Sequence, residues 1–434
     1  MIYKNITRQQ TVERTYRTIE WRQPVAVALF ALLIAFARMP DRVIYGFLWG
    51  EDGKIFLKQA YDLGARSIIT PYAQYLHVIP RLIALVFSKI SFIDQAARPF
   101  MWMATIVLCA TCAYLFTFAR KTLPLPAAWV FGLAPILVPH SGEVWLTITN
   151  LQWVIAPALL VLLWDEFCSP AADVSRRSGD VTRGIAIVLM TLTGPFGLLF
   201  APVVVAGLLF TRKIHRSRRA WLAIATYFIA VGTQLVTIAV SPAPNMAPGE
   251  AKHHLLDYLQ FPWKGQFLRH LVLDFVMPVA WVDRLGQHWG AAAIVCFAAM
   301  ILCVVGATKG NRLICAALAI LAVGLWMIGV IRAATWSGDI VWYSAGGRYF
   351  YIPFVLLAWA ILLSTSTSAY SSIRILGAFL LGMVGLTSMS QFSAQIYMHP
   401  SASYQETTQT WQLAMPPSPD WYITVTPQQL GKSK

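Results

Sequence analysis

Residues 312–332 read RLICAALAILAVGLWMIGVIR, and this stretch decides the fold class of the protein. Nineteen uncharged, mostly apolar residues separate Arg312 from Arg332. A helix needs about 20 such residues to cross the hydrocarbon core of a bilayer. Because the apolar residues run continuously and do not alternate with polar ones, a helix is favoured over a strand of a membrane barrel. The stretch therefore predicts a transmembrane helix.

Comparable apolar runs recur along the chain and predict an all-α fold, a polytopic membrane bundle of about eleven transmembrane helices. Two of the runs meet at Gly194 and Pro195, residues that interrupt helices. The two runs form either one long kinked helix or two helices that meet at a break, and we favour two because basic residues flank both outer ends. The predicted spans are residues 24–38, 98–119, 124–140, 149–165, 184–196, 197–211, 219–240, 289–307, 312–332, 348–366 and 373–391.

The composition agrees with a membrane protein. Of the 434 residues, 57% are hydrophobic and 12% are charged, and the mean hydropathy is +0.59. A soluble domain is about 25% charged, so this chain has too few charged side chains to cover a water-soluble particle of its size. These figures exclude a soluble enzyme, a disordered chain and a nucleic-acid-binding protein, although the net charge is +15.

The basic residues predict the topology. Eighteen of the 34 Lys and Arg residues fall in the N-terminal segment and five short turns, which the positive-inside rule places in the cytoplasm. No small-residue cleavage site follows the first apolar run, so we expect the first helix to remain as an anchor. The chain then divides into a transmembrane module, residues 1–391 with outer loops at 39–97 and 241–288, and an extracytoplasmic tail, residues 392–434.

The first outer loop carries two adjacent carboxylates, Glu51 and Asp52, directly before a predicted helix. Either the pair caps that helix, whose free N–H groups attract acids, or one carboxylate takes a proton from a substrate hydroxyl. Residues 55–63 and 78–90 are predicted to be amphipathic helices in the membrane interface. The apolar face of the first is formed by Ile55, Leu57, Ala60, Tyr61 and Leu63.

Aromatic and basic residues accompany the acidic pair. Aromatic rings stack on apolar faces of ligands such as sugars, and arginine binds phosphate. The presence of these residues in the same loop favours the catalytic interpretation of the carboxylates. The residues concerned are Trp49, Tyr72, Tyr75, His77 and Arg81.

Three histidines in the second outer loop, His253, His254 and His270, raise the question of a metal site. Adjacent histidines point in different directions on a helix, and no His or Cys at ligand spacing accompanies them. Contact with lipid headgroups is therefore the favoured interpretation. The loop as a whole is predicted to be an amphipathic cover over an outer cavity.

Asn150 and Gln152 lie at the start of a predicted span, where polar side chains are costly unless they face the interior of the bundle. They serve either substrate binding or hydrogen bonds between helices, next to Trp153 in an interfacial belt. The sequence leaves both interpretations open.

Two arginines at outer helix ends are candidates for binding a phosphate group. Arg348 begins a predicted span after two glycines, and its guanidinium offers paired N–H donors to phosphate. A salt bridge to Asp339 is the alternative role of Arg348. Arg332 ends the preceding span on the same side, where extension of the side chain toward water is the alternative.

The acidic pair, its flanking interfacial helices and the polytopic layout resemble the membrane glycosyltransferases of the GT-C superfamily. Residues 49–53 (WGEDG) and 71–81 (PYAQYLHVIPR) also look like a group of bacterial multi-pass, glucosyltransferase-like proteins. Shorter similar pieces occur at residues 149–153, 194–197 and 347–350. The resemblance covers most of the chain in layout and only short pieces in residues.

The resemblance implies an enzyme of a bacterial cytoplasmic membrane that moves a sugar from a polyprenyl-phosphate donor to an acceptor hydroxyl on a glycan or lipid. Glu51 and Asp52 match the acidic motif of the family, whose carboxylate acts as the base or holds a divalent cation, Mg or Mn. We expect Asp52, helped by Glu51, to remove the acceptor proton, with inversion at the anomeric carbon. The expected phosphate ligands are Arg348, Arg81 and Arg332. The expected substrate contacts are Trp49, Tyr72, Tyr75, His77, Asn150, Trp153 and Tyr349.

Two other classes remain as alternatives. A lipid-linked glycan polymerase or ligase would use the outer arginines and a histidine such as His77, without the acidic pair. A non-enzymatic lipid or solute transporter or flippase would show matching helix breaks in two halves. The sequence has one strong break, at Gly194 and Pro195.

Overall fold

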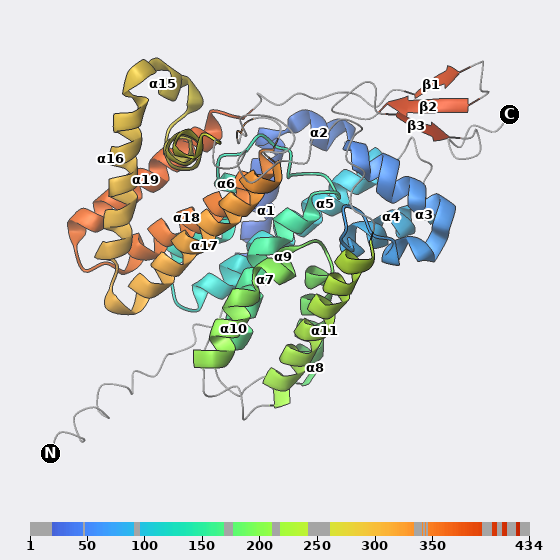
Figure 1. Ribbon diagram of the computed structural model, residues 1–434, viewed down its shortest axis with the longest axis horizontal. Coiled ribbons are helices and arrows are strands. Elements are labelled where there is room, and N and C mark those ends of the chain that lie inside the picture. Colours follow the sequence, from blue (N-terminus) through green and yellow to red (C-terminus); the bar gives the residue numbers. More distant parts are fainter. Residues whose placement is uncertain are drawn as a thin grey trace.

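Helices form over nearly all of the apolar runs in the computed structural model (Figure 1). The structure describes residues 20–46, 48–90, 96–168, 177–210, 218–241, 261–333, 341, 343, 346–392, 402–405, 410–414 and 422–425.

The helical elements of the first half alternate long helices with a cluster of short ones in the first outer loop. They are α1 (Arg22–Arg38), α2 (Pro40–Tyr45), the π-helix η2 (Asp52–Leu57), α3 (Lys58–Leu63), the 3-10 helix η3 (Gly64–Ile69), α4 (Val78–Ile90), α5 (Ala97–Arg120), α6 (Leu125–Leu137), α7 (Leu151–Phe167), α8 (Arg177–Thr191), α9 (Phe196–Leu199) and α10 (Ala201–Phe210).

The second half repeats this pattern, with the short helices in the second outer loop. The elements are α11 (Arg218–Val240), α13 (Trp263–Gly265), the π-helix η6 (Gln266–Leu273), α14 (Asp274–Val276), α15 (Val279–Arg284), the 3-10 helix η7 (Gly286–His288), α16 (Trp289–Gly306), α17 (Lys309–Ala333), α18 (Arg348–Thr367) and α19 (Ser371–Met389).

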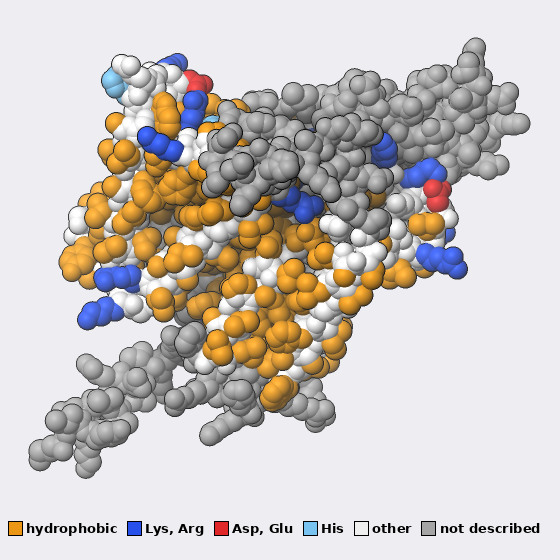
Figure 2. Space-filling model, viewed as in Figure 1, with side chains coloured by type: hydrophobic (Ala, Val, Ile, Leu, Met, Phe, Trp, Pro, Cys, Tyr) orange, Lys and Arg blue, Asp and Glu red, His pale blue; other side chains and the backbone are white. Residues whose placement is uncertain are grey.

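Six helices among the described residues are long and apolar enough to cross a membrane, namely α5, α11, α16, α17, α18 and α19. α18 is central, since 78% of its apolar segment is buried inside the protein, whereas only 17% of the segment that includes α16 is buried. Large apolar side chains such as Leu313 and Ile320 of α17 are exposed. Figure 2 shows a broad apolar surface on this face of the molecule. A surface of this kind is suited to contact with lipid.

The helices at the other five predicted spans are shorter. α1 and α7 have 17 residues each, α8 has 15, α6 has 13 and α10 has 10. Length and composition therefore give six spans, and the count of about eleven stays a prediction.

The helix break predicted at Gly194 is confirmed. α8 ends at Thr191, Gly194 has a φ of +91°, and α9 begins at Phe196. A Cβ atom on Gly194 would lie 2.0 Å from Oε1 of Gln152 in α7. Only glycine fits here, because the backbone is left-handed and α7 approaches closely.

The segment predicted as the first outer loop folds into η2, α3, η3 and α4, which pack on one another, with α4 also against α5. The residues of the apolar face predicted for its first helix differ in burial. Phe56, Leu57 and Ala60 are fully buried, while Ile55 is partly exposed and Leu63 is exposed. η2 is a π-helix, which has more residues per turn than an α-helix. The residues that it buries therefore differ from those that an α-helical pattern predicts.

The C-terminal tail forms a small three-stranded antiparallel sheet that the sequence patterns did not predict. β1 (Ala402–Gln405) pairs with β2 (Thr410–Ala414), and β2 pairs with β3 (Tyr422–Val425). The sheet lies on the side of the first outer loop (Figure 1), and β3 approaches η2. The fold is thus a helical body with a minor β element outside it.

Candidate functional site

Asp52 is fully buried at the start of η2 and accepts three hydrogen bonds. Oδ2 accepts the N–H of Trp49 at 3.0 Å, and Oδ1 accepts both the N–H (2.7 Å) and the hydroxyl of Thr149. The bond to Trp49 resembles the return half of a capping box, since the helix begins at Gly50. The bonds to Thr149 fasten the first outer loop to the segment before α7.

Burial raises the pKa of Asp52 to about 7, and the hydrogen bonds from Thr149 and Trp49 oppose this rise. The negative charge of Glu51 adds to the rise. Both carboxylate oxygens of Asp52 are engaged by the protein, so its geometry is that of an anchor between two segments.

Glu51, in contrast, is only partly buried. The hydroxyl of Tyr72 donates a hydrogen bond to its Oε1 at 3.3 Å. Its Oε2 has no hydrogen-bond partner in the part of the chain that the structure describes. Burial raises the pKa of Tyr72, and the charge of Glu51 raises it further, so Tyr72 stays a neutral donor.

Arg348 joins the same group from the start of α18. Its Nη1 lies 2.9 Å from Oε1 of Glu143, and its backbone N–H donates to Oε2 of Glu143 at 3.2 Å. The charge of Arg348 also acts on Glu51 and Tyr72. Asp339, the partner considered from the sequence, lies outside the described residues.

Glu143 is a site residue that the sequence patterns did not single out. The available signal was an acidic residue in the short outer segment between two predicted spans. Its pairing with Arg348 joins positions 205 residues apart. Only the folded chain reveals such a pair.

An aromatic wall adjoins this group. The guanidinium of Arg348 lies 5.4 Å from the ring of Tyr349, whose ring lies 5.6 Å from that of Trp153. Trp153 also packs against Phe196 at 4.8 Å. Asn150 is buried, and its amide donates to the carbonyl of Glu143 at 2.8 Å. The sequence-predicted residues Asn150, Trp153 and Tyr349 are thus brought together around Glu143 and Arg348.

Two buried arginines, which the sequence patterns did not single out either, hold the segment that carries Glu143. Arg38 donates to the carbonyls of Ile136 (3.1 Å) and His140 (3.2 Å), and Arg42 donates to that of Gly142 (2.8 Å). Their signal in the sequence was their place at the outer end of the first predicted span, against the positive-inside bias.

His77 and Arg81 lie beneath the surface of the site. Nε2 of His77 donates to the carbonyl of Tyr72 at 3.2 Å, and burial together with the charge of Arg81 lowers the pKa of His77 to about 3. Arg81 donates to Gln59 at 2.8 Å, and its guanidinium lies 5.2 Å from the ring of Phe56. Burial lowers its pKa to about 10. Both side chains are buried, so neither meets a substrate at the surface in this arrangement.

Arg332 and Tyr75 form a separate contact at the C-terminal end of α17. Nη1 of Arg332 donates to the hydroxyl of Tyr75 at 3.3 Å, and the guanidinium lies 5.7 Å from the same ring. This contact ties α17 to the first outer loop and leaves Arg332 exposed.

The described residues do not gather the ligands of a divalent cation. Among the described residues, no group of three or more His, Cys, Asp or Glu is arranged to hold a metal ion, and both oxygens of Asp52 are engaged. His253 and His254 lie outside the described residues. His270 is buried, with Nδ1 2.8 Å from Oδ2 of Asp274, so it contacts a carboxylate and not the lipid headgroups expected from the sequence.

Comparison of the chain with known protein families, with curated protein sequences and with solved structures gives no match. The chemistry of the site therefore rests on its own geometry: a carboxylate with one oxygen that has no partner among the described residues, a tyrosine hydroxyl, a guanidinium and an aromatic wall.

Proposed function

We propose that this protein is a membrane glycosyltransferase of the GT-C type, which moves a sugar from a polyprenyl-phosphate donor to an acceptor hydroxyl of a cell-surface glycan or lipid. The observation that carries the proposal is the grouping of Glu51, Tyr72 and Arg348 beside the rings of Trp153 and Tyr349. A carboxylate and a hydroxyl suit sugar hydroxyls, aromatic rings suit sugar faces, and a guanidinium suits phosphate.

We assign the catalytic base to Glu51 and an anchoring role to Asp52, which reverses the roles expected from the sequence. Oε2 of Glu51 has no partner in the described part of the chain, whereas both oxygens of Asp52 accept hydrogen bonds. A base needs an oxygen within reach of the acceptor proton. Oε2 of Glu51 is buried but has no partner among the described residues, so it can take that proton once the acceptor reaches it, whereas both oxygens of Asp52 are engaged.

The transfer follows from this assignment. The acceptor hydroxyl gives its proton to Glu51 as its oxygen bonds to the anomeric carbon of the donor sugar. The bond from that carbon to the phosphate oxygen breaks, and its electron pair leaves with the polyprenyl phosphate. Attack on the face opposite the leaving group inverts the anomeric centre.

Arg348 and Arg332 are the phosphate ligands of the proposal. The side chain of Arg348 remains 33% exposed despite its pairing with Glu143, and Arg332 is exposed at the outer end of α17. Positive charge beside the leaving phosphate stabilises the negative charge that grows there in the transition state. Arg81 is not given this role, because its guanidinium is buried.

The proposed topology has about eleven spans, a cytoplasmic N-terminus and a site on the extracytoplasmic face of a bacterial cytoplasmic membrane. The helices of the first outer loop lie in the membrane interface. In support, α4 exposes Leu82, Val86 and Ile90 on one side and buries Ile83 and Ala84 on the other. The polymerase or ligase alternative gains no support, because His77 is buried and neutral.

The proposal is tested in cells that lack the native protein. Mass spectrometry of surface glycans and of extracted polyprenyl-phosphate sugars compares these cells with cells that regain the wild type or a variant. We expect the glycan to lose one sugar and the donor lipid to accumulate, with rescue by the wild type and by the control Asp62→Asn, and no rescue by Arg348→Gln. Unchanged glycans and donor lipids in the deletion cells would refute the proposal.

A further inference from the structure

The carboxylate oxygen that the proposed reaction uses is enclosed by the protein. Oε2 of Glu51 is buried and has no hydrogen-bond partner in the part of the chain that the structure describes. Oε1 of the same carboxylate accepts a hydrogen bond from the hydroxyl of Tyr72 at 3.3 Å. A base must come within hydrogen-bond reach of the proton that it takes. Access to Glu51 therefore depends on a neighbouring part of the protein that opens.

Tyr72 belongs to a tight turn with a strained backbone. The N–H of Tyr72 donates to the carbonyl of Tyr75 at 2.9 Å, and the N–H of Tyr75 donates to the carbonyl of Tyr72 at 3.0 Å. Between them, Ala73 and Gln74 have φ angles of +49° and +70°. This is the φ pattern of a type I′ turn, in which Gly, Asn and Asp are the usual residues. Ala73 and Gln74 are strained there because each carries a Cβ atom.

The chain is held directly before the turn. Thr70 donates from its N–H to the carbonyl of Ser67 at 3.2 Å, and from its hydroxyl to the carbonyl of Arg66 at 2.9 Å. Ser67 is fully buried in η3, which packs on α3 and α4. The residues up to Thr70 are therefore fastened to the rest of the first outer loop.

The chain is held again directly after the turn. The N–H of Leu76 donates to Oε1 of Gln234 in α11 at 3.0 Å, and the carbonyl of Leu76 accepts the N–H of Gly194 at 3.0 Å. The N–H of Val78 donates to the carbonyl of Leu192, just after α8, at 3.2 Å. The residues from Leu76 onward are therefore fastened to α8 and α11.

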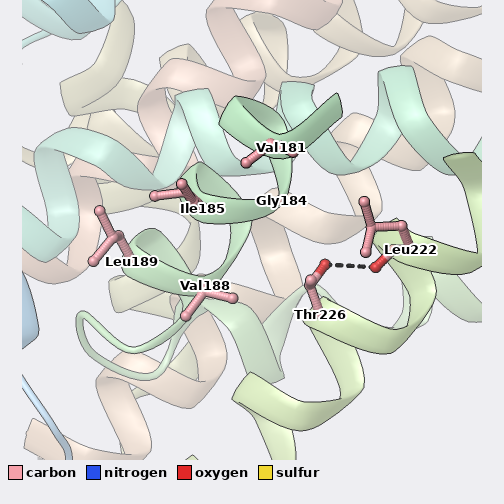
Figure 3. Close-up of a pocket in the computed structure, with 7 residues that line it drawn as sticks. All are labelled: Val181, Gly184, Ile185, Val188, Leu189, Leu222 and Thr226. Carbon is pink, nitrogen blue, oxygen red and sulfur yellow. Dashed lines mark hydrogen bonds between the residues drawn. The ribbon is translucent and has the colours of Figure 1, made fainter. Parts of the chain in front are cut away.

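α8 and α11 lie side by side and form a firm support for this second anchor (Figure 3). A Cβ atom on Gly184 of α8 would lie 3.6 Å from Cγ2 of Thr226 of α11. Apolar side chains of both helices line the groove between them. The segment between the two anchors is residues 71–75 (PYAQY), which we name the turn lid.

The turn lid contacts the proposed base through Tyr72. The ring of Tyr72 packs at 5.8 Å from the rings of both Phe56 and His77, and its hydroxyl bonds to Glu51. Nε2 of His77 donates to the carbonyl of Tyr72 at 3.2 Å. Movement of the turn lid would therefore take Tyr72 away from the carboxylate.

The turn lid contacts α17 through Tyr75. Nη1 of Arg332 donates to the hydroxyl of Tyr75 at 3.3 Å, and the guanidinium lies 5.7 Å from the ring of Tyr75. Arg332 is exposed. Hydrogen bonds and cation–π contacts at a surface are weak, because water competes for the same groups. This contact can break while the buried anchors on both sides remain.

We propose that the turn lid opens and closes over Glu51, with the contact between Arg332 and Tyr75 as its latch. When the latch breaks, the strain at Ala73 and Gln74 favours opening, Tyr72 leaves the carboxylate, and a hydroxyl reaches Oε2. The inference rests on the proposed function for the role of Glu51 as the base. Access to the carboxylate is measurable without sugar transfer, so the two proposals fail separately.

Carbodiimide labelling of the full-length protein in detergent tests the latch. A water-soluble carbodiimide with an added amine converts accessible carboxylates to amides, and peptide mass spectrometry gives the rate at Glu51. We expect labelling about threefold faster than in the wild type for Tyr75→Phe, which keeps the ring, and about fivefold faster for Arg332→Gln. Arg284→Gln, at another exposed position, is the matched control with the wild-type rate. The exposed Asp62 serves as the internal reference.

The strain is tested by a variant that acts in the opposite direction. Ala73→Gly/Gln74→Gly suits the left-handed backbone and keeps the turn lid closed, so we expect labelling of Glu51 to fall about threefold. Hydrogen exchange at the N–H groups of Tyr72 and Tyr75, which close the turn, becomes faster in Arg332→Gln and slower in the glycine variant. A wild-type labelling rate at Glu51 in folded Arg332→Gln and Tyr75→Phe, or faster labelling in the glycine variant, would overturn the proposal.

Discussion

Oδ1 of Asp52 accepts the backbone N–H of Thr149 at 2.7 Å and so joins two segments that are 97 residues apart. One segment carries Glu51, and the other leads from Glu143 to Asn150. The two neighbouring carboxylates of the acidic motif thus have different surroundings. Asp52 holds the two segments together, whereas Glu51 accepts a hydrogen bond from the hydroxyl of Tyr72. This division of tasks is the basis of the predictions that follow.

The pH dependence of stability reports on Asp52. Its pKa is about 7 in the folded protein, whereas an ordinary aspartate, as in the unfolded chain, has a pKa of 3.8, so the unfolded chain releases this proton first as the pH rises. The contribution of Asp52 to the free energy of unfolding therefore falls by up to about 1.4 kcal/mol per pH unit between these pKa values. In Asp52→Asn this fall is absent.

His77 acts in the opposite direction and serves as the control. Burial lowers its pKa to about 3 from 6.5, so the stability that it contributes is present above pH 6.5 and is lost as the pH falls toward 3. Thermal unfolding in detergent from pH 4 to 8 measures both effects. We expect a steeper loss of stability in acid for Asp52→Asn than for the wild type, and a shallower loss for His77→Gln. Parallel curves for Asp52→Asn and the wild type would contradict the raised pKa.

Gly194→Ala is expected to destabilise the protein by about 1–2 kcal/mol or more, because the φ of +91° is unfavourable for a residue with a Cβ atom. The new methyl group also collides with Gln152, 2.0 Å away. Gly232→Ala in α11 is the matched control, since nothing lies within 4 Å of its Cβ position. We measure the melting temperatures of both variants and expect a lower value for Gly194→Ala. Equal values would be inconsistent with strain at Gly194.

Tyr72→Phe removes the hydroxyl that donates to Glu51 at 3.3 Å and keeps the ring, which packs at 5.8 Å from both Phe56 and His77. We expect about a tenfold loss of sugar transfer, since one hydrogen bond to a charged group contributes about 1.5 kcal/mol or more. The melting temperature changes little. Tyr370→Phe, at an exposed position, is the control with wild-type transfer. Wild-type transfer by Tyr72→Phe would show that this hydroxyl has no part in the reaction.

Gln234→Leu is expected to loosen the first outer loop. Oε1 of Gln234 accepts the N–H of Leu76 at 3.0 Å, and Nε2 donates to the carbonyls of Leu76, Thr191 and Gly194. A leucine leaves these buried backbone groups without partners, at a cost of about 1–3 kcal/mol for each unsatisfied group. Hydrogen exchange at residues 76–79 measures the effect, with Thr233→Ala on the exposed face of α11 as the control. Unchanged protection would mean that Gln234 does not hold the loop.

The sequence predicted the helices well, because hydropathy and helix breakers are local properties. The run at residues 312–332 lies within α17, and the break at Gly194 is where the apolar pattern predicted it. The π-helical winding of residues 52–57 was not predictable, because the pattern of 3.6 residues per turn was assumed for the whole helix. No pattern in the sequence assigned strands to the tail, which contains three of them.

The sequence predicted most residues of the candidate site, but only in part which of them contact one another. Asn150 was identified because polar side chains are costly inside a membrane span, and Arg348 because its guanidinium offers paired N–H donors at the start of one. The pairing of Arg348 with Glu143, and that of Asp52 with Thr149, join positions 205 and 97 residues apart, and no local pattern encodes such pairs. Asp52 and Glu51 looked alike in the sequence, and only the contacts made by each side chain distinguish them.

The most direct test of Glu51 as the base is the rate of sugar transfer per folded molecule for Glu51→Gln and Asp52→Asn, measured side by side with the melting temperature. We predict that Glu51→Gln lowers transfer by about 100-fold or more at an unchanged melting temperature. Asp52→Asn should change the melting temperature and lower transfer per folded molecule by less than about tenfold. Full transfer by Glu51→Gln together with an inactive but folded Asp52→Asn would contradict the account.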